Sequence, residues 1–208
     1  NGSTIVATDL VEIEGVAALS APLRVTVLNS SLSLQRGVVL SSSEGAAVNV
    51  SLGSSSSVTC AAPGAALFSF VRSNSIEFVV SQSHIVNCVL LNESASPSGS
   101  AAARSVVRGV VVSSRFSMLD SNRYDTQLYL VERDHSIRSA DVFLVEFDDV
   151  QFAGYSSTAL LPRGPTTSDA SAYMPGRFIF RCSTLDGSFV KLPRNPVIAS
   201  QVRLETKT

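Results

Sequence analysis

The feature that most constrains this chain is a short apolar and polar unit that recurs between residues 27 and 152. In each unit, paired apolar residues are followed by three or four polar residues and then by the pattern apolar, any residue, apolar. The units are anchored at Leu28, Leu52, Val80, Val112 and Val145, with successive offsets of 24, 28, 32 and 33 residues. Such offsets are typical of one supersecondary unit per repeat, with loops of variable length between repeats.

The repeating units are predicted to be strands rather than helices. No stretch of eleven or more residues has apolar residues at i, i+3, i+4 and i+7 with capping residues at its ends. The chain has 27 valines and 36 serines among 208 residues, and β-branched valine suits a pleated strand. Short apolar runs alternate with Ser, Gly, Asn and Pro clusters, which is typical of strands joined by turns. The sequence therefore predicts an all-β protein.

Two all-β architectures fit this pattern. In a parallel β-helix, a solenoid, equivalent apolar residues of successive coils stack into ladders that only neighbouring coils can cover. An antiparallel β-sandwich or jelly roll also needs many short strands with frequent turns. The short strands and the scarcity of Asn-Gly and Asp-Gly hairpin turns favour the parallel β-helix.

The repeat also predicts how the chain is divided. We expect coils over residues 1–161, a loop rich in Pro and Gly over 162–176, and C-terminal strands over 177–208 that cap or continue the stack. Segments 92–104 and 162–175 are predicted to leave the coil as side loops, because Pro and Gly interrupt a ladder. The strands expected at Phe178–Phe180 and Val197–Leu204 could be antiparallel or could form a capping element.

Charge and hydropathy exclude several classes of protein. Charged residues make up only 16% of the chain and the net charge is -1, without a basic stripe, so nucleic acid is not an expected partner. Apolar runs such as Val110–Val112 and Val142–Val145 are far shorter than the roughly 20 residues of a membrane-spanning helix. The chain begins without Met or a signal-peptide pattern, so we expect it to be a segment of a longer precursor.

Four N-x-Ser sequons, each with a middle residue other than Pro, predict N-glycosylation at Asn1, Asn29, Asn49 and Asn92. Asn29 and Asn92 fall in predicted turns, where a bulky glycan can be accommodated. Asn49 lies between two valines and would have to point outward from a strand. Unmodified turn asparagines are the alternative interpretation.

The three cysteines, Cys60, Cys88 and Cys182, match no zinc or redox spacing. Cys60 and Cys88 end two successive units, 28 residues apart, so stacked coils could bring them within bonding distance as a disulfide. Two small buried hydrophobic side chains are an equally good interpretation. The two histidines, His84 and His135, form no metal-binding pair, and no phosphate-binding glycine motif is present, so no metal or cofactor is expected.

Acidic residues gather in the middle third of the chain, at Asp120, Asp125, Glu132, Asp134, Asp141, Glu146, Asp148 and Asp149. A polysaccharide hydrolase or lyase needs paired carboxylates, one as general acid and another as base or calcium ligand. Coils offset by about 30 residues could place Asp120 near Asp149. Asp120, Asp125, Asp148 and Asp149 are therefore the catalytic candidates of this alternative, while a solvated acidic face explains the same residues.

Residues 23–152 carry segments such as LRVTVLNSSLSL, VNVSLGSSSSVTC and RGVVVSSRFSM. In composition they resemble the right-handed β-helix repeats of large surface glycoproteins of single-celled eukaryotes, and this resemblance implies a structural or adhesive role. Pectate-lyase-like enzymes share that fold, but their catalytic motifs match no positions here, so their activity is not carried over.

The sequence thus predicts a non-enzymatic structural or interaction segment of a larger secreted or cell-surface glycoprotein, as in an extracellular filament or coat. Its expected partners are neighbouring segments of the same or another surface protein, because an open-ended solenoid has edges that another segment must cap. A carbohydrate-active β-helix enzyme and a viral shell subunit on a jelly roll are the alternative functions.

Overall fold

The fold is all-β, as the sequence predicts. A computed structural model of the chain describes residues 3–14, 21–61, 65–71, 74–94, 105–118, 131–133, 142–154, 177–181, 183–185 and 202–205. Within these residues the chain forms seventeen strands and no helix. Every strand pair among them is parallel. The antiparallel sandwich or jelly roll is therefore wrong for these strands.

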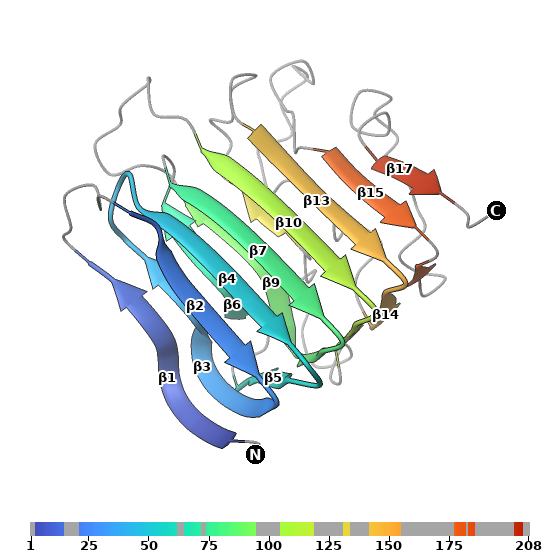
Figure 1. Cartoon of the computed structure of the whole chain (residues 1–208), viewed down its shortest axis with the longest axis horizontal. Coiled ribbons are helices and arrows are strands. Elements are labelled where there is room, and N and C mark those ends of the chain that lie inside the picture. Colours follow the sequence, from blue (N-terminus) through green and yellow to red (C-terminus); the bar gives the residue numbers. More distant parts are fainter. Residues whose placement is uncertain are drawn as a thin grey trace.

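One sheet has seven strands that lie side by side in chain order, in the foreground of Figure 1. Its strands are β2 (Leu23–Leu28), β4 (Ala47–Gly53), β7 (Ser75–Ser81), β10 (Val106–Val112), β13 (Val142–Asp148), β15 (Arg177–Arg181) and β17 (Val202–Glu205). Burial alternates along these strands, as in β7, where Ile76, Phe78 and Val80 are buried. This period of two places one apolar face inward and the other toward solvent.

The other sheet has ten strands and curls behind the first. One arm of this sheet consists of the short strands β5 (Ser57–Cys60), β8 (His84–Val86), β11 (Arg115–Ser117), β14 (Gln151–Ala153) and β16 (Thr184–Leu185). The second arm consists of β6 (Ala65–Val71), β9 (Cys88–Ser94) and β12 (Val131–Arg133). The long strand β3 (Ser30–Ser41) joins the arms, since its first part pairs with β5 and its last part with β6. β1 (Ser3–Ile13) pairs along β3.

The register corrects the alignment of the repeats. The inward residues that lie opposite one another on successive strands are Val27, Leu52, Val80, Val111, Phe147 and Phe180, at offsets of 25, 28, 31, 36 and 33 residues. The predicted anchors Leu28 and Val112 are each one residue too late, and Val145 lies opposite Gly109 instead. A slip of one residue moves a side chain to the other face of a strand. The sequence allowed the slip because apolar residues occupy both faces, as the half-exposed Leu28 shows.

One predicted segment boundary changes, and the direction of the C-terminal strands is settled. The side loop expected from residue 92 begins later, because β9 continues to Ser94. The C-terminal strands β15 and β17 pair in parallel with the seven-stranded sheet, so the antiparallel option is wrong for them. Residues 162–175 and 197–201 lie outside the described residues.

Phenylalanines of successive strands stack within the core. The ring centroids of Phe147 and Phe180 are 4.7 Å apart, and those of Phe68 and Phe78 are 4.8 Å apart. Gly109 occupies the inward position next to Phe78, and a Cβ at Gly109 would overlap that ring. The missing side chain on one strand therefore makes room for the large side chain on the next.

A repeated turn joins the two sheets. Asn29, Ser55, Gln82, Ser113 and Asp149 all have positive φ angles, between 45° and 65°. The backbone N–H of each donates to a carbonyl of the following unit, as from Gln82 to Val112 at 3.0 Å and from Asp149 to Arg181 at 3.0 Å. These bonds stack the turns one above another and satisfy backbone groups that are not in strands.

A serine follows four of these turn residues, and Ser183 lies just before β16 in the next unit. We call Ser30, Ser56, Ser83, Ser114 and Ser183 the serine ladder. The Ser114 hydroxyl donates to the Val112 carbonyl at 2.8 Å and accepts from the Ser83 backbone N–H at 3.1 Å. Ser56 and Ser183 accept from the preceding unit in the same way. Val150 interrupts the ladder, but its own N–H donates to Ser183. The hydroxyls of Ser56, Ser114 and Ser183 thus each bond within their own turn and to the turn before it.

Candidate functional site

Two surface hollows bring polar side chains together. The turn shelf is a shallow depression of about 470 Å³ beside the serine ladder, and its exposed lining includes Ser55, Gln82, His84, Ser113, Arg115 and Asp149. The outer groove, of about 630 Å³, lies on the solvent face of the seven-stranded sheet, and its lining includes Arg24, Asn49, Glu77, Val79, Arg108 and Val110. Both hollows run across several strands, so neighbouring units supply their side chains.

A histidine and a serine hydroxyl meet beside the turn shelf. His84 Nε2 lies 3.0 Å from Ser117 Oγ, and Arg115 lies opposite His84 on the adjacent strand. Partial burial of the ring, and then the charge of Arg115, lower the pKa of His84, so the ring is neutral at neutral pH. A neutral imidazole can act as a general base. However, Ser117 is only 4% exposed, which keeps its hydroxyl away from a substrate. The contact is better explained as a hydrogen bond between adjacent strands.

The carboxylates proposed from the sequence do not form a facing pair among the described residues. Asp149 is an exposed turn residue on the shelf and accepts a hydrogen bond from Ser113 at 3.1 Å. Asp148 ends β13, opposite Val112 and Arg181 on the neighbouring strands. Asp120 and Asp125 lie outside the described residues, so the expected proximity of Asp120 to Asp149 stays a prediction.

The outer groove combines exposed valines with charged residues. Val79 and Val110 lie opposite each other on β7 and β10 and are 45% and 40% exposed. Glu77 and Arg108 lie opposite each other two residues earlier, and both are exposed. Among the described residues, the side chains of Glu77 and Arg108 make no hydrogen bond or ion pair, although their backbones are paired within the sheet. The groove therefore presents an apolar pair beside two unpaired opposite charges.

The sequons occupy three different surroundings. Asn29 is an exposed turn residue with a φ of 48°, in agreement with its predicted turn. Asn49 is half-buried in β4 between buried valines, so it points outward, into the outer groove. Asn92 is not in a turn: it is half-buried in β9, because pairing on both sides, with Ser69 and Glu132, continues the strand past it. Asn1 lies outside the described residues.

A disulfide joins the two cysteines that the sequence placed in successive units. Cys60 and Cys88 are bonded, with Cα atoms 5.2 Å apart, and both are almost fully buried. Cys60 ends β5 and Cys88 begins β9, so the bond crosses between neighbouring units. Cys182 lies outside the described residues.

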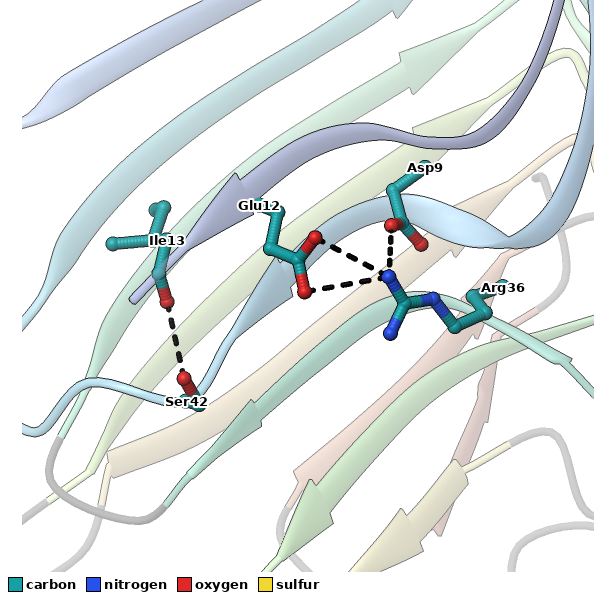
Figure 2. A network of polar contacts seen from close by, with 5 residues as sticks. All are labelled: Asp9, Glu12, Ile13, Arg36 and Ser42. Atoms are coloured by element: carbon teal, nitrogen blue, oxygen red, sulfur yellow. Dashed lines mark hydrogen bonds and ion pairs between the residues drawn. The ribbon is translucent and has the colours of Figure 1, made fainter. Parts of the chain in front are cut away.

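An ionic clamp fixes the bend shared by β1 and β3. Figure 2 shows the carboxylates of Asp9 and Glu12 on β1 pointing toward Arg36 on β3, with nitrogen to oxygen distances of 2.5 Å and 3.2 Å. The hydrogen bond from Arg36 to Asp9 is the main reason that the pKa of Arg36 is raised. The clamp lies beside Gly37, where a Cβ would overlap the carbonyl oxygen of Ala66. Sequence reasoning missed this clamp, because the two acidic residues and the arginine are far apart in the chain.

Comparisons with known proteins give no further guide to the site. No protein-family model, curated protein or solved structure matches the chain. Within the described ranges, no group of histidine, cysteine and acidic side chains could hold a metal ion. In the same ranges, no helix is long and apolar enough to cross a membrane.

Proposed function

We propose that the chain is a parallel β-helix segment of a secreted or cell-surface glycoprotein, with a structural or interaction role. The path of the chain supports the solenoid: β7, β8 and β9 form one unit, and β10 and β11 pair with β7 and β8 in parallel. Each unit thus adds one strand to the seven-stranded sheet before it enters the other sheet. Stacking of this kind leaves the strands of each unit in contact with the units before and after it.

The observation that carries the proposed compartment is the buried disulfide between Cys60 and Cys88. Structural disulfides persist in oxidising environments and are rare in the cytosol of most organisms. The exposed sequon at Asn29 supports the same compartment, because a glycan there would meet only solvent. A structural role agrees with the remaining features: the described surface has shallow hollows, and its one histidine–serine pair is shielded from a substrate.

Peptide mass mapping of the natively purified protein tests this proposal, without reduction and before and after enzymatic removal of N-glycans. We expect a Cys60–Cys88 disulfide-linked peptide and a glycan at Asn29. Asn87 is the matched control, because it is a turn asparagine with a φ of 57° outside any sequon and should carry no glycan. Reduced cysteines together with unmodified sequons would overturn the secreted glycoprotein.

A further inference from the structure

The solvent face of the seven-stranded sheet exposes apolar side chains beside charged ones. Here the outer groove exposes Val79 and Val110 side by side, and Val142 on β13 is also 40% exposed. On β13 the residue opposite Val110 is Glu146, and Val142 lies four residues earlier on that strand. Val79 and Val110 therefore form a small apolar patch beside charged residues, and an apolar patch rimmed by polar residues is a common mark of an interaction site.

The charges of Glu77 and Arg108 can be satisfied by the same face of a second copy. Glu77 and Arg108 carry opposite charges, lie on adjacent strands and are unpaired among the described residues. A two-fold axis parallel to the strands, midway between β7 and β10, would place Glu77 of each copy against Arg108 of the other. The same axis would place Val79 against Val110. An axis along either strand would instead oppose two Glu77 or two Arg108 side chains, so the charges select the midway position.

We propose that the chain forms a two-fold symmetric dimer through the outer face of this sheet, with its axis between β7 and β10. This inference names a partner for the interaction role proposed above and rests on that role. The area is adequate: seven strands spaced about 4.8 Å apart and roughly 20 Å long give a plane of roughly 600 Å². Its corrugated accessible surface approaches the roughly 800 Å² per partner of a standard interface.

The dimer makes a prediction about the sequon at Asn49. Asn49 lines the outer groove one strand away from Glu77. A glycan there would fill the space that the second copy needs, so glycosylation of Asn49 and dimerisation exclude each other. Asn29 lies in the turn at the end of β2, outside the groove lining, and a glycan at Asn29 is compatible with the dimer.

Sedimentation equilibrium over a range of concentrations tests the dimer, using an Asn49→Gln chain so that no glycan covers the groove. We expect twice the monomer mass at high concentration. Glu77→Arg and Arg108→Glu should each weaken the dimer about tenfold, because each change turns two attractive contacts into repulsive ones. The double variant Glu77→Arg/Arg108→Glu should restore dimerisation.

The matched control is Arg115→Glu, which makes the same charge change as Arg108→Glu on the turn shelf and should leave the dimer unchanged. Circular dichroism of each variant separates loss of the dimer from loss of the fold. A monomer at every concentration, or equal weakening by Arg115→Glu, would overturn the inference. So would dimerisation of chains whose Asn49 carries a glycan. None of these outcomes changes the mass mapping of Asn29 and the disulfide, so the two proposals fail separately.

Discussion

Gly109 and Phe78 share one space in the core. The benzyl group of Phe78 extends across the neighbouring strand to where a Gly109 side chain would stand, and it also packs against Phe68. Glycine in a strand usually weakens it. At this position glycine is required, because any Cβ would displace a ring that is only 2% exposed.

Gly109→Ala is therefore expected to destabilise the fold by about 1–3 kcal/mol, the usual cost of overpacking a core. Phe78→Leu shortens the side chain that fills the space, so the double variant should lose less than the sum of the two single losses. Urea unfolding of the four proteins in this cycle measures the coupling. Additive losses, or an unchanged midpoint for Gly109→Ala, would contradict the shared space.

His84 gives the fold a pH dependence. Its pKa in the folded protein is lowered from 6.5, chiefly by partial burial of the ring and also by Arg115, so the unfolded chain binds the proton more tightly. The stability that the neutral ring contributes is present above pH 6.5 and is lost as pH falls through the lower folded pKa. His84→Gln should flatten the fall of the melting temperature between pH 7 and pH 5. Parallel curves for the two proteins would show that His84 does not contribute.

At the scale of the element, the turn between the sheets shows what the abundant serines do in the structure. A hydroxyl at the same place in successive turns satisfies one carbonyl of its own turn and one N–H of the preceding turn. Buried backbone groups need such partners. The high serine content, which the sequence connects only with turns, thus includes the buried residues Ser56, Ser83 and Ser114, which connect the units.

Ser114→Ala should destabilise the protein by about 1–3 kcal/mol, because the Ser83 backbone N–H is left buried without this acceptor. Ser113→Ala is the matched control: its hydroxyl is in the same turn but exposed, and its loss should change stability by less than about 0.5 kcal/mol. Thermal unfolding of the two variants makes the comparison. Equal effects at the two positions would show that the serine ladder is not a source of stability.

Much of the element pattern could be read from the sequence, but not the register. Strand content follows from local patterns, and the spacing of the units offered the Cys60–Cys88 disulfide as one of two interpretations, which the structure confirms. The face that Leu28 and Val112 occupy does not, because apolar residues on both faces leave a one-residue slip undetermined. Asn92 illustrates a second limit: a turn-forming residue stays in a strand when strands on both sides bond to it. The Arg36 clamp depends on contacts between strands, which no local pattern records.

At the scale of the whole molecule, the contacts run mainly between neighbouring units. Each strand of the seven-stranded sheet is bonded to the strands before and after it in chain order. Stability in such a stack is approximately a sum of local and nearest-neighbour contributions. The outer groove is the exception, because its lining comes from five successive strands, β2 to β13. A surface of that kind exists only when the units are assembled in register, so any function that uses the outer groove requires all five strands to be folded.

The turns of the serine ladder also explain why units of unequal length can stack. In four successive crossings a strand of the seven-stranded sheet ends three residues before the next strand begins, as from Ser81 to His84 and from Asp148 to Gln151. The opposite edge absorbs the difference, since the gap from Ser94 to Val106 is longer than that from Val71 to Ser75. The edge that carries the serine ladder therefore has connections of constant length in these units, whereas the connections at the opposite edge vary in length. New loops, and any binding specificity they bring, can arise at that opposite edge without changing the pairing of the strands.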